Sequence, residues 1–267
     1  MARTYGYLAV FAVTHLSLLL IYPPSVPRVL SVLAFFGCGL TLILLLIFHP
    51  RIHWLAPART LVPSGARPAV ALTFDDGPSP EVTPRVLAIL REKAVPATFF
   101  CVGREVERHP ELARLVAAAG HEIGSHSYGH HPLFGFLLPG RMRREIAGGQ
   151  RAIAAATGVT PRLFRPPVGE RHPYLADALA RASLSLVMWD LRTYDTRATT
   201  AAELTARILG GVRPGSILLM HDRPGAGAEA MIEALPGVID RLRERGFDFV
   251  TAGGAAGDAV ADAAAAP

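Results

Sequence analysis

The residues best able to do chemistry in this 267-residue chain stand directly after short apolar runs. Each run has the length and composition of a buried strand, and the polar residues follow where the run ends. They are two adjacent aspartates, two histidines four residues apart, an arginine, and a further aspartate and histidine: Asp75, Asp76, His126, His130, Arg165, Asp195 and His221. Because the carboxyl ends of parallel strands meet at one face, we predict that these side chains share one mouth.

These side chains predict a hydrolytic metal site. Two neutral imidazoles and a carboxylate, His126, His130 and Asp76, can hold a divalent cation and leave positions open for water and substrate. Such a cation acidifies a water molecule and polarises a carbonyl group. Asp75 could accept the proton of that water, with Arg165 favouring its ionised form.

A general acid is predicted on the other side of the mouth. His221 could protonate a departing nitrogen, with a carboxylate such as Asp195 orienting its ring. Asp190, which follows the apolar run ending at Trp189, is also expected there. Metal, base and acid together predict the hydrolysis of an amide or an ester.

Two other classes of function remain open. A phosphatase can also use paired aspartates after a strand, but such sites typically separate the carboxylates by one residue and need no histidine pair. A non-catalytic glycan-binding or scaffold protein needs neither a base nor an acid. Each fragment alone also has an ordinary explanation, since histidine pairs occur by chance in loops and adjacent carboxylates in solvated turns.

Apolar runs alternate with helical segments about seven times beyond residue 69. The predicted strands are 69–74, 97–102, 121–125, 162–164, 184–189, 216–220 and 247–250. The predicted helices are 81–93, 111–119, 142–157, 174–181, 201–209 and 228–245. This alternation is typical of a parallel sheet, and we expect it to close into a barrel.

The first 50 residues predict a membrane hairpin. Segments 5–22 and 29–48 are apolar and almost uncharged, and the second can cross a hydrocarbon core of about 30 Å. The proline-rich connection 23–28 is short, so both ends of the pair face the same side. A cleaved signal peptide is the alternative for the first segment. Residues 51–68 would be a linker, and the Ala/Gly-rich tail 253–267 is expected to be disordered.

The distribution of charge argues against a nucleic-acid partner and predicts the orientation of the hairpin in the membrane. The chain carries 27 basic and 22 acidic side chains, but its arginines are scattered, so we expect no nucleic-acid binding. Its two cysteines exclude a disulfide framework. Arg3, Arg51, Arg59 and Arg67 lie on one side of the hairpin and Arg28 on the other, which favours the cytoplasm for everything beyond residue 50.

Five motifs, in order, resemble those of the polysaccharide deacetylase family, also called the NodB homology domain or carbohydrate esterase family four. They are Thr73-Phe74-Asp75-Asp76-Gly77, His126-Ser127-x-x-His130, Arg165-Pro166-Pro167-x-Gly169, Trp189 with Asp195, and Leu219-x-His221. The resemblance covers about residues 69–250. It implies an α/β fold, a distorted (β/α) barrel of about seven parallel strands over 69–252, and metal-dependent removal of an N-acetyl or other N-acyl group from an amino sugar.

The resemblance also implies a role for each residue. Asp75 would be the base and His221 the acid, braced by Arg165 and Asp195 respectively. Asp76, His126 and His130 would bind one divalent metal, Zn, with Co, Ni or Mn as alternatives. The residues expected to contact the substrate are Leu219, Trp189 and, through its backbone N–H, Val168.

Three features depart from the family pattern and bear on the substrate. Val168 stands where an aromatic residue is usual, and Arg192 and Thr196 replace a carboxylate and a tryptophan of the fourth motif, which alters the platform for a sugar chain. The apolar loop 133–139 either packs over the barrel end or touches lipid.

The expected partners are therefore membrane lipid and either a glycan polymer or a lipid-linked amino sugar. We expect a multi-pass protein of the cell membrane. The side of its catalytic domain stays open, since the arginine bias favours the cytoplasm and the resemblance favours the exterior.

Overall fold

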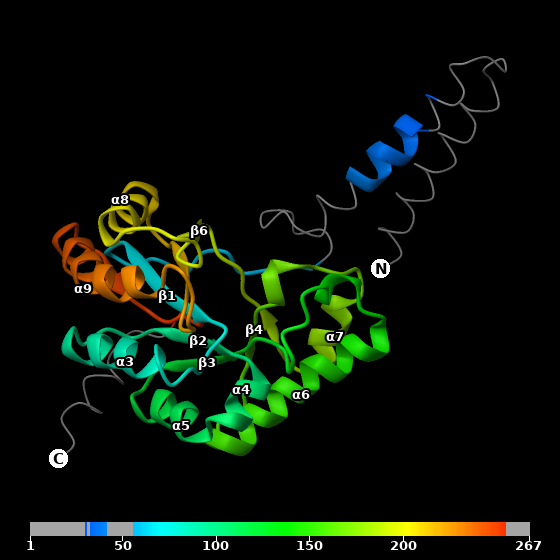
Figure 1. Ribbon diagram of the computed structural model, residues 1–267, viewed down its shortest axis with the longest axis horizontal. Helices are drawn as coiled ribbons and strands as arrows, with labels where there is room; N and C mark the ends of the chain where they lie inside the picture. Colours follow the sequence, from blue (N-terminus) through cyan, green and yellow to red (C-terminus); the bar gives the residue numbers. More distant parts are fainter. Residues whose placement is uncertain (1–29, 31–32, 42–55, 255–267) are drawn as a thin grey trace.

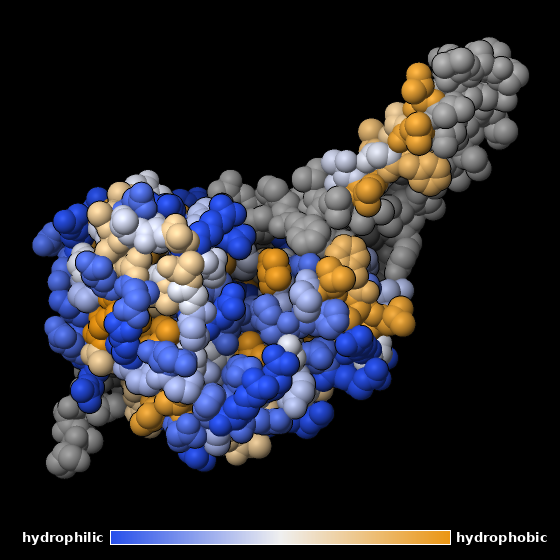
Figure 2. All heavy atoms as spheres, in the orientation of Figure 1, coloured by the Kyte–Doolittle hydropathy of each residue, from blue (hydrophilic) through white to orange (hydrophobic). Residues whose placement is uncertain are grey.

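The computed structural model describes residue 30, residues 33–41 and residues 56–254. The predicted membrane helix 5–22 lies outside these residues, as do half of 29–48 and the tail 255–267. Residues 33–41 are helical, and Leu33, Phe36 and Leu40 on them are exposed, giving the apolar surface seen in Figure 2. None of the helices within the described ranges is both long and apolar enough to cross a membrane.

Residues 69–249 contain eight parallel strands in one sheet (Figure 1). Their spatial order is β5-β4-β3-β2-β1-β7-β6, and β8 pairs with β1 beside this path. The strands are β1 (Ala69–Asp75), β2 (Thr98–Cys101), β3 (Glu122–Ser125), β4 (Leu163–Phe164), β5 (Ser185–Leu186), β6 (Leu191–Arg192), β7 (Ile217–His221) and β8 (Asp248–Phe249). Each of the seven predicted runs overlaps one of these strands, and β6 was not predicted.

Helices connect the strands and surround the sheet (Figure 1). They are α3 (Thr83–Glu92), α4 (Gly103–Arg108), α5 (Pro110–Ala118), α6 (Pro139–Thr157), α7 (Leu175–Arg181), α8 (Ala201–Gly211) and α9 (Ala228–Glu244), with 3-10 turns at Phe134–Phe136 and Pro167–Gly169. Local sequence explains some of their ends. Thr200 and Glu203 form a capping box at the start of α8, and α6 ends at the left-handed Gly158.

The sheet is a distorted half-barrel, and its two edge strands, β5 and β6, belong to one continuous stretch of chain. After β5 pairs with β4, the chain crosses to the other edge and pairs with β7 as β6. Asp190 lies within this crossing, and its carboxylate accepts hydrogen bonds from the Ile217 backbone N–H (2.8 Å) and the Ser216 hydroxyl (3.0 Å). The expectation that Asp190 lies at the mouth was therefore wrong, because the strand continues past it and it binds the amino end of β7.

The alternation of inward and outward side chains along β1 positions Asp75 at the predicted mouth. Val70, Leu72 and Phe74 pack outward in the core beneath the helices, whereas Ala69 and Ala71 face the barrel interior. Thr73 and Asp75 share that inner face. The small alanines leave interior volume for large side chains at the carboxyl end of the barrel. Asp75 pairs in register with His221 of β7, so these two residues lie side by side at the rim.

Part of the predicted linker packs on the domain. The Arg59 backbone N–H donates to the carbonyl of Leu186, and the Val62 N–H donates to that of Gly215. Ala56 and Val62 are buried. Residues 59–62 therefore pair with the chain that follows β5 and with the residues just before β7.

Candidate active site

The adjacent aspartates point to different partners because the backbone turns sharply between them. Asp75 ends β1 in extended conformation, whereas Asp76 has a φ of 78°, in the left-handed region. Asp75 Oδ1 lies 2.7 Å from Arg165 Nη1, and Asp76 Oδ1 faces the two histidines. One carboxylate is thus bound to a fixed cation, and the other is free to bind a metal ion.

Arg165 is fully buried and fixes the position of Asp75. Its guanidinium also donates to the Thr73 hydroxyl at 2.8 Å and to the backbone carbonyls of Val187 and Met188. The group lies 4.1 Å from the centre of the Phe100 ring. Burial lowers the pKa of Arg165, although its ion pair with Asp75 opposes that shift. The arginine predicted to favour ionised Asp75 is in place.

Asp76, His126 and His130 are brought together as predicted. Asp76 Oδ1 lies 3.4 Å from His126 Nε2 and 3.0 Å from His130 Nε2, and ligand atoms from all three lie within 4.8 Å of one another. His126 Nδ1 lies 2.7 Å from the carbonyl oxygen of Arg165. Because a carbonyl only accepts, the proton is assigned to Nδ1, which leaves the Nε2 lone pair facing Asp76.

This geometry fits a cation. Asp76 Oδ1 is buried and accepts no hydrogen bond from the residues described here. An acceptor oxygen facing an imidazole lone pair is repulsive unless a cation or a proton lies between them. Burial raises the pKa of Asp76, but the two adjacent imidazoles outweigh burial and hold it well below its usual range. Asp76 is therefore ionised, as a carboxylate that binds a cation must be.

His221 and Asp195 form the predicted acid pair. Burial lowers the pKa of His221, but the hydrogen bond and charge of Asp195, together with the charges of Asp75 and Asp76, outweigh burial and raise the pKa above its usual value. Asp195 Oδ1 lies 3.0 Å from His221 Nδ1, and Oδ2 accepts the backbone N–H of His221 at 2.7 Å. The Thr193 hydroxyl donates to Asp195 as well. His221 can therefore hold a proton near neutral pH with its ring fixed.

These groups line one cavity of about 140 Å³ at the carboxyl end of the barrel. The residues predicted to contact substrate, Leu219, Val168 and Trp189, also line it. Gly169 has a φ of 78°, and a Cβ there would lie 2.5 Å from the Trp189 ring, so this position requires glycine. The cavity is smaller than common ligand pockets, so it suits an acyl group rather than a whole sugar chain.

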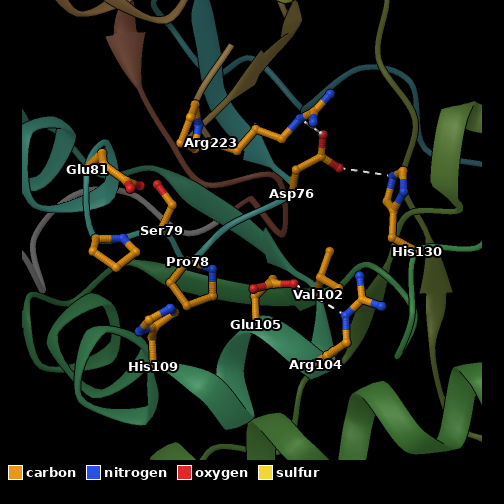
Figure 3. A pocket seen from close by; sticks show the side chains of 12 residues that line it. Asp76, Pro78, Ser79, Glu81, Val102, Arg104, Glu105, His109, His130 and Arg223 are labelled. Carbon is orange, nitrogen blue, oxygen red and sulfur yellow. Dashed lines mark hydrogen bonds and ion pairs between the residues drawn. The ribbon is translucent and has the colours of Figure 1, made fainter.

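Two residues near the site were given no role in the sequence analysis. Arg223 Nε lies 2.7 Å from Asp76 Oδ2, on the side away from the histidines (Figure 3). Asp222 is buried below, where it accepts hydrogen bonds from the Gly77 N–H and the Thr83 hydroxyl. Both follow His221 directly, but their contacts with the β1–α3 loop depend on tertiary structure and leave no local sequence signal.

A second, larger cavity of about 490 Å³ adjoins the first. Asp76, His130 and Arg223 line both cavities, and Arg104 and Glu105 of α4 lie at the far side of the larger one (Figure 3). The site formed by Asp76, His126 and His130 (the ion centre) therefore lies between a small acyl-sized space and a larger space of mixed polar and apolar lining that is large enough for a sugar.

Comparison with known proteins agrees with the geometry. The family model for polysaccharide deacetylase matches residues 63–187. Over 182 residues the chain is 35% identical to a peptidoglycan N-acetylglucosamine deacetylase of Bacillus cereus, which covers 68% of this chain and 66% of that protein. Over 197 residues it is 36% identical to a chitooligosaccharide deacetylase of Bradyrhizobium, which covers 70% of this chain and 89% of that protein.

One of the solved structures that resemble this chain is described as a pseudoenzyme. A carbohydrate esterase family 4 pseudoenzyme from Bacillus anthracis matches with a TM-score of 0.67 at 30% identity, over 75% of this chain and 69% of that one. Membership therefore shows the fold and not turnover, which must be argued from the site itself. By its sequence similarity and by the order of its five motifs, this chain belongs to the polysaccharide deacetylase family.

Proposed function

We propose that this protein is a metal-dependent hydrolase that removes the N-acetyl group of an N-acetylglucosamine unit in a glycan. One observation carries the proposal: a carboxylate held by arginine, a histidine held by a carboxylate and a three-residue cation site surround a single cavity of about 140 Å³. A glycan-binding protein needs neither a base nor an acid, and a phosphatase with paired aspartates typically separates the carboxylates by one residue and needs no histidine pair.

A divalent cation held by Asp76, His126 and His130 would polarise the acyl carbonyl and acidify a water molecule. Asp75 has one oxygen fixed by Arg165, while Oδ2 lies 3.9 Å from His126 Nε2 and faces the ion centre. It can therefore take a proton from water that attacks the carbonyl carbon. We assign to the Val168 backbone N–H the contact with the developing oxyanion.

His221 completes the reaction on the same cavity. As the carbon–nitrogen bond breaks, protonated His221 donates its proton to the departing nitrogen, which leaves as the amine of the sugar, and acetate is the second product. Asp195 stabilises the charged imidazole throughout this step. Leu219 and Trp189 form the walls that enclose the acyl group.

We propose zinc as the metal, with cobalt, nickel or manganese as substitutes, because two imidazoles and one carboxylate with open positions suit these ions. Asp76→Ala and His126→Ala should each lose bound metal and activity on N-acetylglucosamine oligomers, with metal measured by elemental analysis and acetate release by mass. Asp75→Asn should keep the metal and lose turnover. Full turnover after the loss of either metal ligand would refute the proposal.

We further propose that the protein is anchored in the membrane through segments 5–22 and 29–48. The exposed Leu33, Phe36 and Leu40 of the helical residues 33–41 support this proposal. Fusion of a reporter enzyme to Pro267, active on only one side of the membrane, would identify the side of the catalytic domain. A fusion protein found entirely in the aqueous fraction would contradict anchoring.

An exposed apolar loop favours a lipid-linked amino sugar as a second candidate substrate. Phe134 and Leu137 pack into the domain, whereas Leu133, Phe136 and Leu138 are 55%, 49% and 78% exposed. Part of the loop 133–139 therefore packs on the domain, and its exposed side chains support the contact with lipid that we propose. The metal-loaded enzyme should be incubated separately with membrane lipid extract, peptidoglycan and chitin oligomers. Loss of an acyl mass from the lipid fraction alone would select the lipid-linked substrate, and loss from a polymer alone would exclude it.

A further inference from the structure

Two arginines line the catalytic cavity beyond the groups that the reaction needs. Arg192 of β6 and Arg223 both face the space that holds the ion centre, the base and the acid. Arg223 is paired with Asp76. Arg192 is exposed, and no carboxylate among the described residues lies within ion-pair distance of it. The cavity therefore carries one cation with an unused charge.

Neighbouring groups hold this cation in place and add to its charge. The guanidinium of Arg192 lies 5.3 Å from the centre of the Tyr194 ring, and those of Arg197 and Arg207 lie 5.0 Å and 5.9 Å from it. Tyr194 has a φ of 61° and turns outward between the buried Thr193 and Asp195. Three guanidinium groups around one exposed ring give the rim a positive potential.

The local carboxylates leave Arg192 and Arg197 without an ion pair among the described residues. Asp195, the nearest in sequence, is buried and bound to His221. Arg207 donates to the backbone carbonyl of Thr193, and the charge of Glu203 partly offsets its own. Arg192 stands where the family resemblance led us to expect a carboxylate. A fixed fork of N–H donors at that place suits phosphate or carboxylate, which guanidinium binds through two parallel hydrogen bonds.

We propose that Arg192, supported by Tyr194 and Arg197, is a specificity residue that binds an anionic substituent of the substrate, a phosphate or a carboxylate carried by the N-acylated sugar. The proposal rests on the proposed deacetylase function and narrows it to anionic amino sugars. The N-acyl group occupies the small cavity, and the anion lies at its rim beside Arg192.

The test compares three sugars that share one acetamido group. They are the neutral methyl glycoside of N-acetylglucosamine, the same glycoside with a lactyl carboxylate on O3, and N-acetylglucosamine 1-phosphate. The metal-loaded wild-type protein should show a kcat/KM about ten- to a hundredfold higher for at least one charged sugar than for the neutral one. The larger of the two preferences identifies phosphate or carboxylate as the group recognised.

Arg192→Gln should abolish that preference by lowering kcat/KM for the charged sugars alone. Arg114→Gln removes the same charge from an exposed position of α5, away from the cavity, and should leave the preference unchanged. Added salt should weaken the wild-type preference, because an exposed ion pair is screened. Equal kcat/KM for all three sugars, or an equal loss for all three in Arg192→Gln, would overturn the inference and leave the deacetylase function standing.

If no sugar is deacetylated, a binding measurement distinguishes the anion site from the deacetylase function. Calorimetric titration of each sugar into the protein as purified should show tighter binding of a charged sugar, and Arg192→Gln should remove that difference. Binding with this pattern but without acetate release would contradict the deacetylase function and keep the anion site. Equal binding of charged and neutral sugars would reject the anion site.

Discussion

Replacing Asp195 by asparagine tests whether His221 is the general acid. The substitution keeps the shape of the side chain and an oxygen that can accept the His221 backbone N–H, but it removes the charge beside Nδ1. A hydrogen bond to a charged group contributes about 1.5–3 kcal/mol. Since about 1.4 kcal/mol changes a rate tenfold, kcat/KM at neutral pH should fall about ten- to a hundredfold.

The pH dependence of the same variant gives the sharper result. Asp195 raises the pKa of His221 against the opposing effect of burial, and an acid must be protonated to act. Activity is therefore lost as pH rises through this raised pKa. In Asp195→Asn the pKa should fall, so the alkaline limb of the kcat/KM profile should move to lower pH.

The assay is acetate release from N-acetylglucosamine oligomers across the pH range, with bound metal measured in each sample. His221→Ala should retain metal and lose about 10²–10⁴ in rate without an alkaline limb from this group. Thr193→Val, which removes one hydrogen bond to Asp195 and no charge, is the matched control. An alkaline limb of Asp195→Asn that stays in place or moves to higher pH would refute the assignment of His221.

Two further predictions concern stability. Arg165→Met leaves Asp75 buried and unpaired, so it should lower the free energy of unfolding in urea by about 3–5 kcal/mol. The double variant with Asp75→Leu should lower it by less. An equal loss in both variants would contradict the buried ion pair. Burial raises the pKa of Asp222 from 3.8 to about 7. The folded protein therefore holds this proton more tightly than the unfolded chain, and the free energy of unfolding falls as pH rises through that range. Measured without metal, Asp222→Asn should therefore gain a few kcal/mol relative to wild type between pH 4 and 8, and a constant difference would show that Asp222 is ionised throughout.

Most of the domain could be predicted because its strands are short apolar runs followed by polar residues. The alternation of Val70, Leu72 and Phe74 with small interior residues is visible in the sequence, and it places Asp75 at the rim. The catalytic residues could be found for the same reason, since each belongs to a compact local motif. The helix α4 was missed because its six residues are too few to show a helical period.

The remaining errors concern contacts between distant parts of the chain. Asp190 has the polar character of a strand end, but its carboxylate binds the Ile217 N–H, 27 residues away. Arg223 resembles an ordinary loop arginine, and its importance comes only from its 2.7 Å contact with Asp76, in the loop that follows β1. Periodicity and motif spacing describe neighbours along the chain, so neither contact could be inferred from them.

The fold separates the proposed catalytic groups from the groups that we propose select the substrate, and one residue links the two sets. The base, the cation site and the acid stand at the ends of β1, β3 and β7, where ladder hydrogen bonds fix the backbone. Trp189, Arg192 and Tyr194 belong to the stretch that crosses between the two sheet edges, where pairing is short. Substitutions in this stretch can change the preferred sugar and leave the base and the cation site in place. Asp195 is the link, because the same stretch carries it to His221, so a change that moves Tyr194 should also alter the proton donor.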